Sequence, residues 1–439
     1  MMQIVNISQI SENALCTGCG ACAGICPSNA IEIITNTAGY LVANIDIDLC
    51  TDCGKCAKIC PSNPENNPSI ETDDIFHGVC LAGYVGYAGD NTIREKSQSG
   101  GIVTALLCYL LEQNEIEGAI VNNLNQETRR PQAILASSKD EIINACGSYY
   151  AQSSVVKTIL ENSEKNTAAV VLGCQGESLQ LIHEKYPKVH LPKYTIGLIC
   201  SGQFSGNKID DLIEQSGCDA KKLSGFRFKD KSIGGWPGDV HVATFNKDCW
   251  LPKEKRHELK QVFELHRCLA CYDQMSLFCD IVCGDPWGIA NKQQPEGHTV
   301  VIARTERGKK LLENAAKDGA IIIEELSTDA IFRGQTVDER HKTKFYTCRD
   351  IFHENKWQFP FPEHYFENIS YTPANQKVRL GLNERLVYTR DLYLTTDRED
   401  YNRKISLKKK KLQGNIIQKL KRKMMRCAGI ILRKLSIIK

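Results

Sequence analysis

A cysteine pattern that occurs twice near the start of the chain constrains its fold more than any other feature. The stretches CTGCGACAGICP (residues 16–27) and CTDCGKCAKICP (residues 50–61) share the spacing C-x2-C-x2-C-x3-C-P. Three thiolates within seven residues can surround one corner of an iron–sulfur cube, whereas the fourth lies too far along the chain and binds another cube. The doubled pattern therefore predicts two 4Fe-4S clusters that exchange their fourth ligands.

The exchange defines two sets of four expected ligands. The first cluster would be held by Cys16, Cys19, Cys22 and Cys60, and the second by Cys50, Cys53, Cys56 and Cys26. Zinc sites favour two C-x2-C pairs rather than triplets, and they do not account for this spacing. The segments AIEII and GYLVANID between the quartets predict two short strands joined by a turn. Residues 12–64 resemble a bacterial dicluster ferredoxin, with every ligand position matched.

The ferredoxin-like part is only a fraction of the molecule. The chain has 439 residues, a length that predicts roughly three domains. The stretch PSNPENNPS has the composition of a linker, and beyond it strand-like and helix-like segments alternate, which predicts an α/β domain with partly parallel strands. The fold class we expect is an α+β ferredoxin-like dicluster module followed by an α/β domain. The expected boundaries are 1–70 for the module, 75–170 and 171–332 for the two halves of the α/β domain, 333–402 for a capping or partner-binding extension and 403–439 for a basic tail.

Two features of the sequence bear on where the protein works. The start MMQIVNISQI lacks the charged residues and the long apolar run of a signal sequence, and no apolar run of about 18 residues occurs elsewhere. The 21 cysteines include repeated metal-ligand spacings, which fits a reducing compartment better than a disulfide framework. We therefore expect a cytoplasmic protein.

The positive charge is concentrated at the C-terminal end. The chain has a net charge of +3, but residues 403–439 contain fourteen Lys and Arg and no acidic residue, which leaves −11 for the rest. Apolar residues from Ile416 to Leu435 recur near helical spacing, a pattern typical of a basic amphipathic helix. Two interpretations stay open, peripheral contact with an anionic membrane face and docking on an acidic surface of the protein or a partner. No nucleic-acid-binding motif occurs, and we expect no such partner.

The stretch SQSGG is a candidate anion-binding loop. It lies between a strand-like segment and the apolar run IVTALLCYLLEQN, which has helical period. A glycine-containing loop between a strand and a helix offers backbone N–H groups to an anion. Ser99, Gly100 and Gly101 are therefore candidates for binding a cofactor phosphate. The alternative is an ordinary helix start with a serine cap, which the local sequence favours.

A further group of cysteines lies in the second half of the α/β region. Cys268 and Cys271 form a C-x2-C pair, which can hold one edge of a metal or cluster and needs two more ligands. Cys174 and Cys200 each follow an apolar strand, where an α/β sheet normally builds its site. We prefer these two as the partners of the pair.

Two other cysteines compete for that role. Cys279 and Cys283 lie four residues apart and close to the pair in sequence. Cys108 lies within a helical apolar run and is expected to be a small core residue. The ligands of a third site therefore remain a choice between two sets.

An ordered set of motifs carries a resemblance to a known family. The motifs are SQSGG, GSYYAQS, GCQGE, GLICSG, CLAC and CDIVCGDPWG. From about Leu81 to Leu326 the chain resembles the beta subunits of coenzyme F420 hydrogenases and dehydrogenases, which implies an FAD-binding α/β domain with its own 4Fe-4S cluster. By this resemblance the flavin would be lined by Ser99, Gly100, Gly101, Gly147, Ser148 and Gln175, and a third 4Fe-4S cluster would be held by Cys174, Cys200, Cys268 and Cys271.

Two positions depart from the family pattern. Leu172 and Gly173 stand where a small residue and Pro commonly precede the Cys-Gln pair. Tyr149 stands where a basic residue often follows Gly-Ser, which removes a cation from the expected flavin site. Other catalytic classes have no motif support, because the chain lacks a phosphate-binding P-loop, an H-E-x-x-H zinc motif and a G-x-G-x-x-G dinucleotide fingerprint.

The resemblance implies an oxidoreductase that converts between one-electron and two-electron transfer. Electrons would pass between the 4Fe-4S clusters and FAD, and from there to or from a redox partner protein or a hydride carrier such as coenzyme F420. A cluster carries single electrons whereas a flavin holds one or two. The rival hypothesis is a non-catalytic electron-delivery subunit without flavin, docking on a membrane surface or on a partner enzyme, for example one of surface-polysaccharide synthesis.

Overall fold

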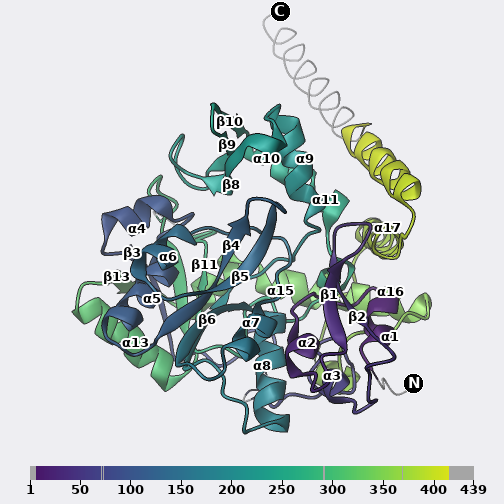
Figure 1. The fold of residues 1–439 in the computed structure, drawn as a ribbon, viewed down its shortest axis with the longest axis horizontal. Coiled ribbons are helices and arrows are strands. Elements are labelled where there is room, and N and C mark those ends of the chain that lie inside the picture. Colours follow the sequence, from purple (N-terminus) through teal and green to yellow (C-terminus); the bar gives the residue numbers. More distant parts are fainter. Residues whose placement is uncertain (1–5, 71, 73, 290–291, 368, 415–439) are drawn as a thin grey trace, which may run out of the picture.

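The computed structural model describes residues 6–70, 72, 74–289, 292–367 and 369–414. Its N-terminal module contains the two predicted strands, β1 (Ile31–Thr35) and β2 (Leu41–Ile45), which pair antiparallel. Three short helices accompany them, α1 (Ser8–Glu12), α2 (Ala21–Ile25) and α3 (Lys55–Lys58). Helix α2 packs against α3, so the two cysteine motifs lie side by side (Figure 1).

The rest of the fold is built on an eight-stranded sheet with the order β13-β3-β12-β11-β7-β6-β4-β5. The four consecutive strands β11, β7, β6 and β4 run parallel, whereas the remaining neighbours pair antiparallel. This confirms the predicted α/β organisation. The strands are β3 (Ala82–Ala88), β4 (Gly118–Asn125), β5 (Arg130–Ala136), β6 (Thr167–Leu172), β7 (Tyr194–Leu198), β11 (Ile281–Gly284), β12 (Thr299–Ala303) and β13 (Ile321–Glu325).

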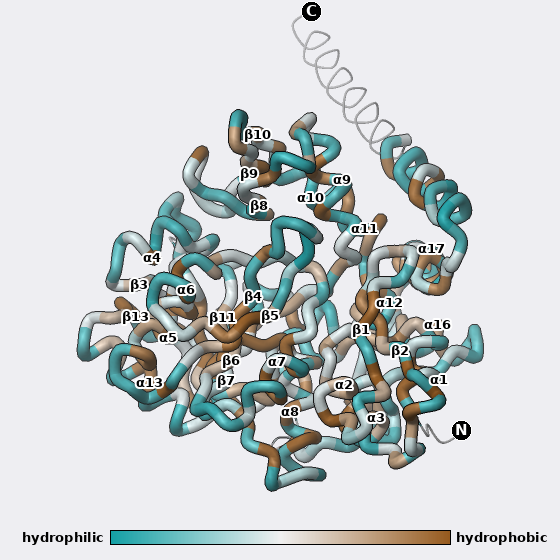
Figure 2. The backbone as a smooth tube through the Cα atoms, viewed as in Figure 1, coloured by the Kyte–Doolittle hydropathy of each residue, from teal (hydrophilic) through white to brown (hydrophobic). Residues whose placement is uncertain are grey.

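Helices cover both faces of this sheet. Successive residues of a strand point to opposite faces, so neighbouring residues of β6 pack against different helices. Ala168 of β6 packs in one core cluster with residues of α5 (Ile102–Glu112) and α13 (Glu306–Lys317). Its neighbour Ala169 packs in another cluster, with residues of α7 (Val155–Glu161) and α8 (Gly173–Lys185). Figure 2 shows the hydrophobic strands near β6 and β11 in the middle of the molecule, with hydrophilic segments around them.

A second, antiparallel sheet was not predicted from the sequence. It has the order β10-β9-β8 and consists of β8 (Leu223–Asp230), β9 (Asp239–Thr244) and β10 (Lys247–Leu251). The pairing of β8 with β9 shifts register twice, which interrupts the regular alternation by which a strand is recognised. Figure 1 shows this sheet apart from the large one and next to α9 (Asn207–Ser216).

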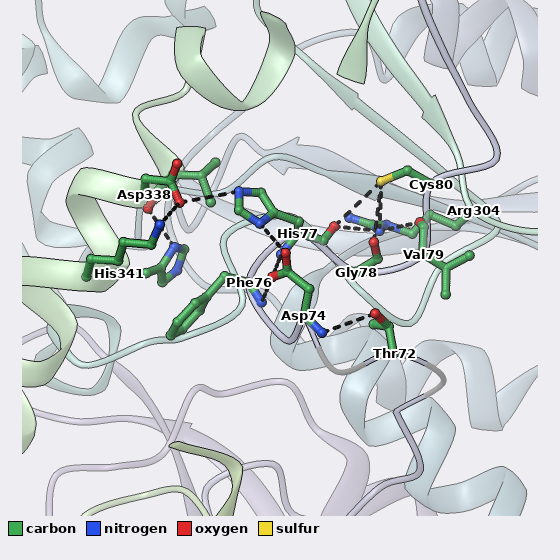
Figure 3. Close-up of polar contacts among 12 residues, drawn as sticks. Thr72, Asp74, Phe76, His77, Gly78, Val79, Cys80, Arg304, Asp338 and His341 are labelled. Carbon is green, nitrogen blue, oxygen red and sulfur yellow. Dashed lines mark hydrogen bonds and ion pairs between the residues drawn. The ribbon is translucent and has the colours of Figure 1, made fainter. Parts of the chain in front are cut away.

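Residues 61–80 connect the ferredoxin module to the large sheet. Asn63 and Asn66 are buried, and both side chains donate to a carbonyl oxygen of α3 (3.0 and 2.8 Å), so this part of the predicted linker belongs to the module. The later part is held by Arg304, whose guanidinium donates to the carbonyl oxygen of His77 (2.9 Å), as Figure 3 shows. Both ends of the connection are therefore fixed by hydrogen bonds.

The C-terminal extension is helical and packs on two other parts of the protein. Tyr393 stacks on Tyr40 of the ferredoxin module with 5.2 Å between ring centroids, and Thr389 Oγ1 lies 3.0 Å from Nδ1 of His266. Its elements are α14 (Thr328–Gly334), α15 (Val337–Glu339), a π-helical turn (Arg340–Phe345), α16 (Tyr346–Glu354), α17 (Gln376–Tyr393) and a helix over 398–414. The extension thus joins the ferredoxin module to the segment before Cys268.

Short helices complete the described structure. They are α4 (Asn91–Lys96), α6 (Lys139–Asn144), α10 (Lys253–Glu258), α11 (Lys260–Phe263) and α12 (His266–Leu269). Two 3-10 turns are formed by Ala220–Lys222 and Glu363–Phe366. Helix α12 carries Cys268.

The described part of the basic tail makes ion pairs within the chain. The pairs are Lys404 with Asp391 (2.8 Å) and Asp400 (2.7 Å), Lys409 with Asp211, and Lys411 with Glu384 (2.9 Å). Up to residue 414 the tail therefore contacts acidic side chains of the protein itself. The predicted amphipathic stretch over 415–439 lies outside the described residues. Across the described ranges, no helix is both long and apolar enough to cross a membrane.

Candidate functional site

The two cysteine loops of the ferredoxin module have the same backbone conformation. The residue before the second cysteine has positive φ in both, Gly18 (68°) and Asp52 (50°). The residue after that cysteine is Gly20 (81°) in the first loop and Gly54 (67°) in the second, and each begins a short helix. The left-handed conformation favours glycine because it has no side chain. The sequence repeat is thus a structural repeat.

The structure brings the first predicted ligand set together. Burial raises the pKa of the Cys22 thiol well above its usual value, and the neighbouring Cys16, Cys19 and Cys60 raise it further. Like charges act in this way only when they are close. Four buried thiols of one site would disfavour ionisation in each other, which a bound cationic iron centre would reverse.

The second predicted set lies nearer the surface. Burial raises the pKa of Cys56, with further increases from Cys53 and Cys50, and Cys53 is exposed. Cys26 directly follows α2, which packs on the helix of Cys56, and its thiol lies 3.6 Å from Ser28 Oγ. Among the described residues, no group of three or more His, Cys, Asp or Glu is arranged to hold a single metal ion.

The preferred third set also converges. Cys174 follows β6 and Cys200 follows β7, and these neighbouring parallel strands end at the same edge of the sheet. Burial raises the pKa of Cys174, Arg267 lowers it, and Cys271 and Cys268 raise it again. Burial and then Cys200 raise the pKa of Cys268 to about 12. Cys268 and Cys271 therefore lie within electrostatic reach of both Cys174 and Cys200.

The competing cysteines, Cys279 and Cys283, lie on or just before β11. Burial raises the pKa of Cys279 well above its usual value. The charged groups that also shift this pKa are Asp273, Arg304 and Asp280, and none of them is a cysteine. Its sulfur packs so close to Gly197 that a Cβ there would lie at 2.9 Å. Burial alone raises the pKa of Cys283 to about 12. No cysteine is among the groups that shift the pKa of either thiol, although Cys283 lies on the same cavity wall as Cys268 and Cys271.

A fully buried arginine connects the first and third cysteine sets. Arg267 Nη1 lies 3.4 Å from Cys271 Sγ, while Nη2 donates to the carbonyl oxygen of Pro61 (2.8 Å) and Nε to Ser62 Oγ (3.2 Å). Pro61 and Ser62 directly follow Cys60 of the ferredoxin module. Burial raises the pKa values of Cys19 and Cys174, and the same guanidinium opposes this rise. No sequence pattern marks Arg267 as a site residue, although it directly precedes Cys268.

Among the described residues, Arg267 forms an ion pair with one acidic side chain, and that side chain is poorly suited to balance its charge. Glu177 Oε2 lies 3.7 Å from the guanidinium, and burial raises the pKa of Glu177 to about 8 despite the lowering effect of Arg267. A buried cation needs a compensating charge. Anionic clusters on either side would supply it, so this arginine fits the expected iron–sulfur sites.

One cavity of about 970 Å³ lies at the carboxyl ends of β6 and β7. This is near the upper end of volumes typical of cofactor sites. Of the residues predicted for the flavin and the third cluster, its wall contains Ser99, Gly101, Gly147, Ser148, Gln175, Cys200, Cys268 and Cys271. Gly100 and Cys174 are not on the wall, although Ser99, Gly101 and Gln175 beside them are.

The SQSGG loop uses part of its hydrogen-bonding capacity within the protein. Ser99 Oγ donates to the carbonyl oxygen of His298, and the Gly100 amide donates to Thr299 Oγ1 (3.0 Å). Helix α5 begins after Gly101 without a side-chain cap, and its first turn lines the cavity. The first amides of a helix lack intrahelical partners and attract anions. The first turn of α5 is therefore a better candidate for a phosphate than the Gly100 amide.

The loop that contains Gly147 and Ser148 is fixed at both ends. Gln98 Nε2 donates to the carbonyl oxygen of Ser148 (3.2 Å), which ties this loop to SQSGG beside the cavity. At the other end, the amide of Val156 donates to the carbonyl oxygen of Cys19 (3.0 Å). The segment GSYYAQS therefore runs from the predicted flavin residues to the ferredoxin module.

The cavity wall also contains an ion pair that sequence reasoning missed. Lys229 Nζ lies 2.6 Å from Asp285 Oδ2, and Trp236 Nε1 donates to the other carboxylate oxygen (3.3 Å). Burial would raise the pKa of Asp285, but Lys229 lowers it overall. Tyr149 stands where the family often has a basic residue, whereas Lys229 of β8 supplies a cation to the cavity wall. No local pattern marks Lys229 as a site residue.

Comparisons with protein families identify the chain's lineage. Residues 83–160 match the model described as "Coenzyme F420 hydrogenase/dehydrogenase, beta subunit N-term", and residues 164–329 match the companion model for the C terminus of the same beta subunit. The two matches together span more than half of the chain. The chain belongs to the coenzyme F420 hydrogenase/dehydrogenase beta-subunit family. This member also matches a "4Fe-4S dicluster domain" over residues 15–63, which confirms the predicted ferredoxin module.

Named relatives of this beta-subunit family show different coverage. The "Coenzyme F420 hydrogenase subunit beta" of Methanothermobacter thermautotrophicus is 27% identical over 239 residues, covering 52% of this chain and 79% of that protein. The protein of the same name from Methanosarcina barkeri is 25% identical over 283 residues, covering 58% and 89%. The "Coenzyme F420-dependent sulfite reductase" of Methanocaldococcus jannaschii is 25% identical, and this chain spans about half of its length.

A solved structure supports the fold of the same family. A chain of the F420-reducing [NiFe] hydrogenase complex from Methanosarcina barkeri superposes with a TM-score of 0.50 at 20% identity, covering 66% of this chain and 98% of that chain. At this identity the likeness shows the fold alone. The beta-subunit family is one of oxidoreductases, and this chain is an iron–sulfur member of it.

Proposed function

We propose that this chain is an iron–sulfur flavoprotein oxidoreductase with three 4Fe-4S clusters and one FAD. The observation that supports this most is the cavity whose wall contains five of the six residues expected at the flavin and three of the four expected at the third cluster. When bound, FAD would exchange one electron at a time with clusters and two with a hydride partner. The chain's own residues would position these groups and balance their charges.

The proposed roles follow from where the residues lie. The first turn of α5, with Ser99 and Gly101, would bind the flavin phosphate, while Gly147, Ser148 and Gln175 would line the rest of the flavin site. Gly100 would act indirectly, by fixing the loop through Thr299. Cys174, Cys200, Cys268 and Cys271 would hold the third cluster, with Arg267 between it and the ferredoxin clusters.

We propose coenzyme F420 as the hydride partner and a second protein as the electron partner. The relatives' names include coenzyme F420, and several are named as subunits. The ferredoxin module offers a surface for electron exchange, because Cys53 is exposed and the side chains of Ile47 and Leu49 beside that loop are 67% and 53% exposed. Exposed apolar side chains beside a redox site are typical of protein contacts.

The proposal is tested by hydride transfer and by iron content. Protein reduced anaerobically with dithionite and freed of excess reductant should reduce F420, followed as loss of the F420 absorbance, and should reduce NAD far more slowly. Cys268→Ser should lose about four irons per chain and most F420 reduction. Cys279→Ser is the matched control, because no cysteine is among the groups that shift the pKa of this buried thiol, and it should keep its iron. Wild-type protein without flavin would refute the proposal and favour an electron-delivery subunit.

A further inference from the structure

The outer part of the cavity is formed by residues beyond the matched family segments. Its wall there includes Arg340, Lys344, Lys377 and Arg385 from the C-terminal extension and Lys408 and Lys411 from the basic tail. Lys260 of α11 faces the same cavity. The extension, for which the sequence indicated no chemistry, thus supplies a wall rich in cations.

The acidic side chains on the wall do not neutralise these cations. The wall carries eight Lys and Arg but only three Asp and Glu. Each acidic side chain is already paired: Asp285 with Lys229 (2.6 Å), Glu264 with Arg385 (2.7 Å) and Glu384 with Lys411 (2.9 Å). Positive charge therefore remains in excess along the outer part of the cavity.

Lys260 and Arg340 are the cations with the strongest need for a partner. Both are half-buried, and neither side chain makes a hydrogen bond or ion pair within the described part of the chain. Burial lowers the pKa of Lys260, and Arg340 and Arg385 lower it further against the effect of Glu264. Both side chains line one cavity wall with Cys200. Cations held together at partial burial are unfavourable unless an anion joins them.

We propose that this outer compartment binds the carboxylate or phosphate group of a small acid between Lys260 and Arg340. A guanidinium matches either group through two parallel hydrogen bonds, and a lysine adds a mobile cation. The compartment continues into the part of the cavity lined by Ser148 and Gln175. An acid anchored at the cations could extend toward that part, and this last step rests on the proposed function.

The test uses inorganic pyrophosphate as the probe and the full-length protein purified anaerobically. Iron and flavin contents are measured first, and pyrophosphate binding is then measured by titration calorimetry at low ionic strength. We expect the wild type to bind, and Arg340→Gln and the double variant Lys260→Gln/Arg340→Gln to bind about tenfold more weakly or worse. Lys260→Arg, which keeps the charge, and Lys317→Gln, an exposed lysine on α13 away from the cavity, should bind as the wild type does.

Several results would overturn the inference. Wild-type protein that does not bind pyrophosphate, or an Arg340→Gln variant with unchanged affinity, would show that no such site exists. A variant that retains its iron but loses flavin would show that these cations hold the flavin phosphate instead. Pyrophosphate binding by a protein that contains clusters but no flavin would refute the proposed function and still support this anion site.

Discussion

Arg267 Nη1 lies 3.4 Å from Cys271 Sγ, and the same guanidinium donates to the ferredoxin module just after Cys60. One buried cation is thus shared by the proposed third cluster and the first cluster. A positive charge near a cluster stabilises the more negative, reduced form. Arg267 would therefore favour reduction of the clusters proposed on either side of it.

Replacing Arg267 should change reduction potentials more than protein fold. In Arg267→Gln we expect the potential of the third cluster to become more negative by on the order of 60 mV, a tenfold change in a one-electron equilibrium. The measurement is a redox titration followed by electron paramagnetic resonance. Arg379→Gln, an arginine on α17 that pairs with Glu354 and does not contact these cysteines, is the control. Equal potentials in Arg267→Gln and wild type, at full iron content, would contradict the assigned role.

The ion pair of Lys229 and Asp285 should show strong non-additivity. Both side chains are largely buried, so Asp285→Asn leaves an unbalanced lysine and should cost about 3 kcal/mol of unfolding free energy. The double variant Lys229→Met/Asp285→Asn should cost less than the two single variants added together. Denaturant unfolding under argon gives the unfolding free energy of the wild type, the two single variants and the double variant. Additive changes in unfolding free energy would mean that the two side chains do not interact.

Gly20 should tolerate a side chain much less well than another glycine of similar conformation. Gly20 has φ of 81°, and a Cβ there would lie 2.7 Å from the Cβ of Lys157 on α7. Gly217 has φ of 69° but no atom within 4 Å of the added Cβ. Gly217→Ala should cost only the backbone penalty of about 1 kcal/mol, whereas Gly20→Ala should also loosen the contact of the ferredoxin module with α7. Thermal unfolding and iron content are measured for both variants. Equal losses of stability and iron in the two variants would contradict this packing.

Stability should fall on mild acidification partly because of His341. Its ring stacks on Phe76 at 4.3 Å between centroids, and burial lowers its pKa to about 3. Below an ordinary pKa of about 6.5 the unfolded chain takes up a proton that the folded protein does not, so stability decreases as pH falls. Figure 3 shows this ring in the group of residues that holds the connecting segment.

The expected loss from this single histidine is about 2 kcal/mol between pH 7 and pH 5. His341→Phe keeps an aromatic ring against Phe76 but cannot titrate. Its unfolding free energy should therefore depend less on pH than that of the wild type by about this amount. Denaturant midpoints at the two pH values provide the comparison. Parallel pH profiles would show that the folded-state pKa of His341 is not depressed.

The sequence allowed some of the site to be predicted because the information was local. The ferredoxin ligands lie within two short motifs, and Cys174 and Cys200 could be paired because each follows a strand that ends at the same sheet edge. Arg267 and Lys229 could not be found in this way, since their roles depend on contacts between segments far apart in the chain. The β8–β10 sheet escaped prediction because its register shifts interrupt the alternation of side chains.

The positive charge of the outer part of the cavity could not be predicted from the sequence either. Lys260 and Arg340 are separated by 80 residues, and the extension that contains Arg340 has no recognisable motif. Only the packing of the extension on the α/β domain places the two cations on one wall. Long-range packing, rather than composition, determines which charges face a site.

We propose that one chain carries three clusters and a flavin. Anaerobic purification followed by iron, sulfide and flavin quantitation on the same sample determines this cofactor content. We expect about twelve irons, about twelve sulfides and one FAD per chain. About eight irons without flavin would contradict it and leave a dicluster ferredoxin joined to a domain with another role.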